Sequence, residues 1–108
     1  MLVDILVIIW MHFIADFIFQ SNEVARGKSS SNAILGKHVT LYSIPFFWFG
    51  WQFAIINMLA HFATDWITSR ITKRLWADNE VHWFFVVIGL DQAVHMTTLI
   101  TTYWWLVL

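Results

Sequence analysis

The stretch MLVDILVIIWMHFIADFIF, residues 1–19, decides the fold class, because it is almost entirely apolar yet holds a histidine and an aspartate four residues apart. A membrane-spanning helix needs about 20 mostly apolar residues. The stretch has no basic n-region and no small-residue cleavage site, so we expect a retained span and not a cleaved signal peptide. Because buried charge is costly in lipid, His12 and Asp16 must be held or used by something in the protein interior.

The whole chain shares this apolar character. Of its 108 residues, 59% are hydrophobic and 12% are charged, and it contains eight tryptophans and ten phenylalanines. Soluble domains are about 25% charged, and a small domain leaves too much surface in water to bury so many large apolar side chains. We therefore expect one integral membrane domain. The absence of cysteine excludes disulfides, thiolate metal ligands and cysteine nucleophiles.

Four segments approach the length and apolarity of a membrane span, at about residues 2–19, 33–49, 51–69 and 81–108. The sequence therefore predicts an all-α membrane protein, a four-transmembrane-helix bundle. The polar connection at 20–32 predicts a loop, and the charged connection at 70–80 predicts an interfacial helix turn. Gly50 predicts a tight turn, which makes the second and third spans an antiparallel hairpin.

The positions of the cations predict the orientation. All six lysines and arginines lie in or near the connections at 20–32 and 70–80, and none lies at the Gly50 turn or the C-terminus. By the positive-inside rule, both connections face the cytoplasm. Both termini are therefore expected on the non-cytoplasmic side.

The His–Asp pair of the first stretch recurs. MHFIADFI (11–18) aligns with AHFATDWI (60–67), which is consistent with two repeated helical hairpins, and DQAVH (91–95) contains the pair in reverse order. Residues at i and i+4 share a helix face. Since the fourth span runs opposite to the first and third, the reversal puts all three aspartates nearer the cytoplasmic side and the histidines one turn deeper. His38 in the second span adds a fourth imidazole.

These groups are expected to converge inside the bundle, because three aspartates facing lipid would cost on the order of 8–10 kcal/mol on insertion scales. Imidazole and carboxylate without thiolate suit zinc, manganese or iron, which the sequence does not distinguish. Two alternatives stay open, namely Asp–His hydrogen bonding alone and a proton or ion path. The predicted metal ligands are His12, Asp16, His38, His61, Asp65, Asp91 and His95.

Other polar residues lie close to this predicted site. Gln20, Gln92 and Asn57 are candidate hydrogen-bond donors to the ligands, and packing is the alternative for the glutamines. Lys28 and Lys37 on the cytoplasmic rim could steer an anionic group toward the site, with topology charge as the alternative. The chain has no Gly-rich phosphate loop and no basic nucleic-acid stripe, so no nucleic acid is expected as a partner.

Four motifs together, HFIADFIFQ (12–20), KH (37–38), HFATDWITSR (61–70) and DQAVH (91–95), resemble a bacterial and phage membrane family catalogued as domain of unknown function 3307. The resemblance spans essentially the whole chain. It implies a small multi-spanning protein of the bacterial inner membrane, or a phage-encoded one of the host inner membrane, and it implies no activity. The linker between the second and third spans is shorter than in the family pattern. The recurring polar positions map onto His12, Asp16, Gln20, His38, His61, Asp65, Asp91, Gln92 and His95.

A metal site open to the cytoplasmic side would suit a metal-dependent hydrolase or transferase that acts on a lipid or interfacial substrate. One alternative is a proton or metal-ion transport or channel component. The other is a non-catalytic membrane interaction module. The expected partners are the lipid bilayer and either further copies of the chain or other membrane proteins.

Overall fold

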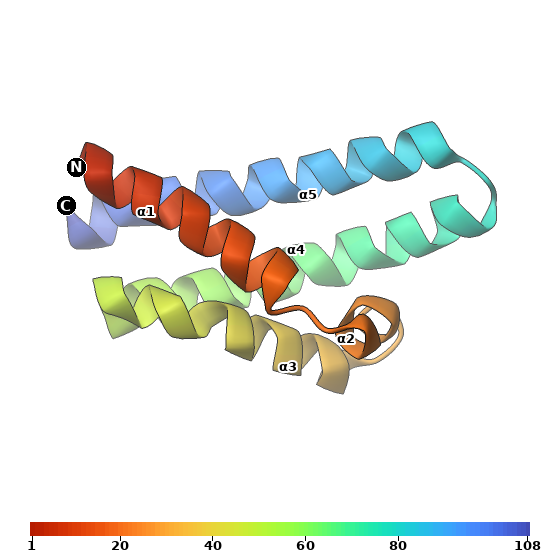
Figure 1. Ribbon diagram of the computed structural model, residues 1–108, viewed down its shortest axis with the longest axis horizontal. Helices are drawn as coiled ribbons and strands as arrows, with labels where there is room; N and C mark the ends of the chain where they lie inside the picture. Colours follow the sequence, from red (N-terminus) through yellow and green to blue (C-terminus); the bar gives the residue numbers. More distant parts are fainter.

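The computed structural model describes residues 1–108 and contains helices only, so the prediction of an all-α fold is confirmed. The helical segments run along the longest axis of a molecule that measures 44 × 27 × 20 Å. Both termini lie at one end of this axis, while α2 and the connection between α4 and α5 lie at the other end (Figure 1). The two polar connections of the sequence are thus brought to the same end of the molecule.

The first segment is α1 (Leu2–Phe13), which continues into the π-helical turn η1 (Ile14–Ile18). The following stretch, predicted as a loop, contains a short helix, α2 (Asn22–Gly27). Its first turn is stabilised because the Ser21 hydroxyl accepts a hydrogen bond from the Val24 amide at 3.2 Å. The serines that suggested a loop therefore cap a helix instead.

The second segment is α3 (Asn32–Ser43), followed by the 3-10 turn η2 (Ile44–Phe49). Pro45 lies at the start of η2 and has no amide hydrogen, which explains why the regular α-helix ends there. Gly50 then adopts a φ of 114°, a conformation open to glycine, and α4 begins at once. The predicted tight turn and antiparallel hairpin are present.

The third segment, α4 (Trp51–Ala77), extends through most of the charged stretch that was predicted as a connection. Arginine, lysine and leucine are good helix formers. The Arg70 guanidinium also donates to the Trp66 carbonyl at 2.8 Å and lies 4.2 Å from the centre of the Trp66 ring. After a turn in which Asn79 has a φ of 57°, α5 (Val81–Thr102) and the π-helical η3 (Tyr103–Val107) complete the chain.

Only one helical segment, Val81–Val107, is long enough and apolar enough by itself to cross a membrane, with a mean hydropathy of 1.4. The prediction of four membrane-spanning helices is therefore supported for one helix and not for the other three. The physical reason is that α1 and α3 are each only 12 residues long, while α4 is long enough but contains several charged and polar residues, which lower its hydropathy. Such a single helix also occurs in the core of soluble proteins, where it is mostly buried, but only 17% of this segment is buried.

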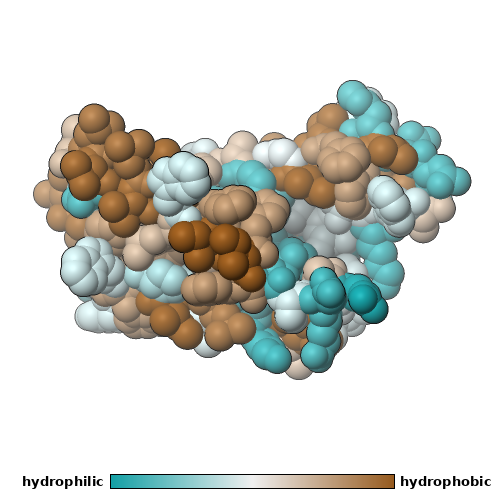
Figure 2. Space-filling model, in the orientation of Figure 1, coloured by the Kyte–Doolittle hydropathy of each residue, from teal (hydrophilic) through white to brown (hydrophobic).

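The distribution of side chains is the reverse of that in a soluble bundle. Ten of the 21 buried residues are polar or charged, and all eight tryptophans are exposed. Hydrophilic residues gather on the surface at the end that holds α2 and the α4–α5 turn, while the rest of the visible face is mainly hydrophobic (Figure 2). A small apolar core, which includes Ile8, Phe46, Phe53 and Leu99, lies toward the end that holds the termini.

Candidate metal centre

Six buried side chains from η1, α3, α4 and α5 converge at the middle of the bundle. We call them the His/Asp cluster. They form two groups in which one ligand atom of each residue lies within 4.8 Å of those of the others. The groups share Asp16 and together comprise Asp16, His38, His61, Asp65, Asp91 and His95.

Local helix geometry explains how these residues meet. His61 and Asp65 are four residues apart on α4, and Asp91 and His95 are four residues apart on α5, so each pair lies on one face. The Nε2 atom of His61 is 3.2 Å from an Asp65 oxygen, and that of His95 is 3.0 Å from an Asp91 oxygen. The rings of His61 and His95 stack in parallel with centres 3.9 Å apart, which holds α4 against α5 at this level.

The larger group, here the four-residue donor set, consists of Asp16, His38, His61 and Asp65. The Nε2 atom of His38 is 3.1 Å from Asp16 Oδ1 and 3.3 Å from Asp65 Oδ2. The Nε2 atom of His61 is 3.5 Å from Asp16 Oδ1 and 3.2 Å from Asp65 Oδ2. Ligands that surround a tetrahedral zinc ion at about 2.0–2.2 Å lie about 3.3–3.6 Å from each other. The donor atoms are therefore spaced as a metal of this size requires.

The available protons do not satisfy these four atoms by themselves. A neutral imidazole has one N–H group, yet His38 Nε2 lies beside two carboxylate oxygens and, at 3.1 Å, beside His61 Nε2. The other ring nitrogen of His61, Nδ1, is buried without a hydrogen-bond partner. A cation among the four atoms would accept a lone pair from each of them at once. The donor set thus fits a divalent metal better than a closed network of hydrogen bonds.

The three-residue donor set consists of Asp16, Asp91 and His95. Asp16 faces both sets with different atoms, since its Oδ1 lies beside His38 while its Oδ2 accepts from the Gln92 amide at 3.2 Å. The same Gln92 amide is 3.1 Å from Asp91 Oδ2. Asp65 behaves similarly, because its Oδ1 lies 3.3 Å from His95. Asp16 is therefore shared by both sets, and Asp65 of the four-residue set also contacts His95 of the other set.

His12, a predicted ligand, lies beside the cluster but outside both donor sets. Its Nδ1 is 2.8 Å from the Tyr42 hydroxyl and its Nε2 is 2.7 Å from the Gln92 side-chain oxygen. Its distance to Asp16 Oδ2 is 4.0 Å. In this arrangement His12 orients Gln92, whose amide group contacts Asp16 and Asp91.

The other predicted polar residues occupy different places. Gln20 lines the cavity described below, and its side-chain oxygen is buried without a partner. Asn57 donates to the Phe53 carbonyl and the Thr102 hydroxyl, so it joins α4 to α5. The Lys28 ammonium is 3.2 Å from Asp65 Oδ2, whereas Lys37 is exposed on α3 and does not line the cavity.

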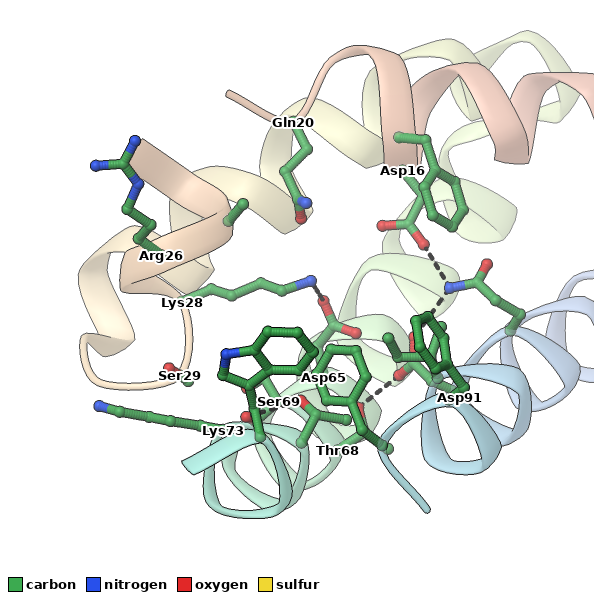
Figure 3. A pocket seen from close by; sticks show the side chains of 18 residues that line it. Asp16, Gln20, Arg26, Lys28, Ser29, Asp65, Thr68, Ser69, Lys73 and Asp91 are labelled. Carbon is green, nitrogen blue, oxygen red and sulfur yellow. Dashed lines mark hydrogen bonds and ion pairs between the residues drawn. The ribbon is translucent and has the colours of Figure 1, made fainter. Parts of the chain in front are cut away.

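A cavity of about 620 Å³ opens from the cluster toward α2. All three aspartates line it and no histidine does, as the reversed order of the third His–Asp pair predicts. Lys28 extends across the cavity to Asp65, while the charged ends of Arg26 and Lys73 lie farther out (Figure 3). Three carboxylates and one ammonium leave the inner wall with a net negative charge, which favours a bound cation.

The sequence analysis did not predict three residues that lie at the cluster or at the cavity wall. Tyr42 follows His38 by four residues and holds His12, and that spacing was the available signal. Thr68 donates to Asp91 Oδ1 at 2.6 Å, and Ser69 is buried at the cavity wall without a partner for its hydroxyl. Nothing in the sequence distinguishes these two from other helical hydroxyls, because their role depends on the neighbouring helix.

No match was found among curated proteins or among solved structures. One protein-family model does match, over residues 3–108, a range that contains every residue of the His/Asp cluster. The chain belongs to the family described as Protein of unknown function (DUF3307).

Proposed function

We propose that this protein is a four-span membrane protein in which the His/Asp cluster holds a divalent metal and serves a hydrolase or transferase reaction on a lipid or interfacial substrate. The single observation that carries the proposal is the four-residue donor set. Its two histidines and two aspartates are buried and spaced at 3.1–3.5 Å, and the neutral imidazoles carry too few protons for every one of these contacts to be a hydrogen bond. Zinc, manganese and iron all suit such a set.

The outer surface supports placement in a bilayer. Large apolar side chains are exposed on every helix except α2, and exposed contiguous apolar surface marks contact with lipid or with other proteins. Four exposed tryptophans belong to elements at the end that holds the termini, namely Trp48 in η2, Trp51 at the start of α4, and Trp104 and Trp105 in η3. Trp76, at the end of α4, and Trp83, at the start of α5, belong to the opposite end. Tryptophan favours both membrane interfaces. The long axis of 44 Å also agrees with the roughly 40–45 Å thickness of a bilayer with its headgroups.

The arrangement of core and cavity favours a reaction site over a channel. On each segment the apolar core residues lie on the terminal side of the cluster, as Ile8 does relative to His12 and Leu99 does relative to His95. The cluster is therefore open toward α2 and closed by apolar packing on the other side. A bound metal would supply an activated water near neutral pH and compensation for negative charge that develops in the reaction.

Metal content tests the centre directly. We expect detergent-purified protein to carry near-stoichiometric metal by elemental mass spectrometry, and the Asp16→Asn/Asp65→Asn double variant to carry none. A wild-type protein that is folded yet free of metal would overturn the proposal. It would leave the cluster as structural hydrogen bonding or as a proton relay.

Thiol labelling tests the membrane topology, and the chain offers a clean background because it has no cysteine. Ser30→Cys places a thiol in the exposed connection after α2, and Gln52→Cys places one beside the Gly50 turn. In bacterial spheroplasts, an impermeant maleimide should label Gln52→Cys at once and Ser30→Cys only after the membrane is permeabilised. Labelling of both positions from the same side would contradict the four-span arrangement.

A further inference from the structure

The walls of the cavity differ in chemical character, and together they indicate which class of ligand the cavity can bind. The inner wall carries the aspartates of the cluster, with Lys28 beside Asp65, the outer rim carries Arg26 and Lys73, and a third wall is apolar. Its volume of about 620 Å³ lies within the range of small-molecule sites, roughly 300–1,000 Å³.

The rim cations have charge that no carboxylate neutralises. Neither Arg26 nor Lys73 forms an ion pair, and Lys73 donates only to the Ser30 hydroxyl, at 2.7 Å. By contrast, Arg74, the next residue of α4, does not line the cavity, and its guanidinium lies 4.0 Å from the Asp78 carboxylate. The unpaired positive charge is thus concentrated where the cavity opens, which suits an anionic group.

Two residues that line the cavity each have a buried polar atom without a partner. One is the hydroxyl oxygen of Ser69, a residue only 6% exposed, and the other is the side-chain oxygen of Gln20. A buried polar group without a hydrogen bond is costly and calls for an explanation. A ligand that both accepts and donates hydrogen bonds in the cavity would supply the missing partners.

The apolar wall extends from the cavity to the outer surface. It is formed by Phe17, Trp76, Phe84, Phe85 and Ile88. Trp76 and Phe84 pack with ring centres 5.0 Å apart, while Phe17 and Phe85 are 48% and 61% exposed. An apolar chain could therefore lie along this wall and continue onto the lipid-facing surface while its polar head enters the cavity.

We propose that this cavity binds a lipid with a phosphate-bearing headgroup. The phosphate lies between the rim cations Arg26 and Lys73 and the His/Asp cluster, near the Ser69 hydroxyl, and the acyl chains follow the apolar wall. The inference rests on the proposed metal, because three carboxylates alone would repel an anion. A water-soluble phosphate ester shares the headgroup chemistry but gains nothing from the apolar wall.

Native mass spectrometry of the detergent-solubilised, metal-loaded protein tests this inference. The probes are phosphatidic acid, diacylglycerol with the same acyl chains, and glycerol 3-phosphate. Phosphatidic acid should bind at least about tenfold more tightly than either of the other two. Equal binding of diacylglycerol would overturn the phosphate requirement, and equal binding of glycerol 3-phosphate would overturn the lipid requirement.

Two variants locate the binding to this cavity. Lys73→Gln should weaken phosphatidic acid binding by about two- to fivefold, whereas the neighbouring control Arg74→Gln should leave it unchanged. Ser69→Ala should also weaken it, although a purely structural role predicts no effect because the hydroxyl has no partner within the protein. If Lys73→Gln, Arg74→Gln and Ser69→Ala all bound phosphatidic acid with the same affinity, the lipid would not bind in this cavity as proposed.

Metal content measured on the same samples separates this inference from the proposed function. Full metal occupancy without a preference for phosphatidic acid would overturn the lipid inference alone. A folded wild-type protein without metal would overturn the proposed function, and the lipid inference would fall with it.

Discussion

The two copies of the His-x-x-x-Asp pattern share four of eight aligned residues but have different structural roles. On α4, His61 Nε2 is 3.2 Å from Asp65, and both residues belong to the four-residue donor set. On the first segment, His12 Nε2 is 4.0 Å from Asp16, and only Asp16 belongs to a donor set. The first copy thus contributes one shared carboxylate, and the second contributes an imidazole and a carboxylate.

The backbone and the neighbouring helices explain this difference. Asp16 lies in the π-helical η1, whose wider turn changes the angle between residues four apart, whereas α4 is regular through Asp65. His12 also faces Tyr42 and Gln92, while His61 faces His38 and His95. A repeated motif therefore predicts where polar groups lie but not which of them can contact a metal.

The largest effect should come from Asp65, which contacts three histidines and Lys28. Asp65→Asn should lower metal affinity by more than about 100-fold, the upper end of the loss on removing an outer-shell partner. Competition with a chromophoric chelator measures this affinity. Asp4→Asn, which changes a carboxylate bound to Tyr103 at the far end, should leave it unchanged. If Asp65→Asn bound metal as tightly as the wild-type protein, Asp65 would not be a ligand as the four-residue donor set requires.

Alanine variants of the two histidines test the comparison itself. His61→Ala removes a donor atom and should reduce metal affinity more than about 100-fold, while His12→Ala disturbs only the support of Gln92 and should reduce it about tenfold. Isothermal titration of both variants with zinc measures the two losses. Equal losses would show that the copies are equivalent and that His12 is also a ligand.

Of the two aspartates in the repeated pattern, Lys28 contacts only Asp65, with its Nζ atom 3.2 Å from Asp65 Oδ2. Because its ammonium repels a cation at the same carboxylate, Lys28→Met should raise metal affinity by about tenfold. Lys37→Met, on the exposed face of α3, is the matched control and should have no effect. A lowered affinity in Lys28→Met would mean that the lysine organises the donor set and does not compete with the metal.

The smallest effect concerns Tyr42, which supports the first copy through His12. Tyr42→Phe and Tyr103→Phe each remove one hydrogen bond, to His12 and to Asp4 respectively, and each should lower the free energy of unfolding by about 0.5–1.5 kcal/mol. Only Tyr42→Phe should also lower metal affinity, by a few-fold. Chemical denaturation and metal titration of both variants separate the two effects.

Sequence patterns predicted much of the fold and most of the cluster. The helical class, the Gly50 turn and the inward faces of Asp65, Asp91 and His95 follow from apolar runs and from four-residue spacing. The spacing was sufficient there because a regular α-helix places i and i+4 on one face. The same rule also places His12 inward, where it is buried, but the rule does not report that His12 contacts Tyr42 and Gln92 or that a π-helical turn follows it.

The connections were harder to predict. Ser21 and the charges at 70–77 resemble a loop in composition, yet Ser21 caps α2 and the charges lie in the last turns of α4, whereas residues 28–30 do form a turn as predicted. Helix capping and hydrogen bonds such as that of Arg70 to the Trp66 carbonyl decide the outcome, and composition does not report them. The number of spanning helices also depends on which polar residues turn inward, which is a tertiary property.

By itself, the sequence determined that this protein is helical, that its apolar side chains exceed what its interior can hold, and that histidines and aspartates recur at helical spacing. Only the tertiary structure decided which of these groups share a donor set, that Asp16 belongs to both sets, and that the rim cations face a cavity with an apolar wall. The physical reason is that helical periodicity acts along one segment. Distances of about 3 Å between side chains of different segments depend on how the helices pack.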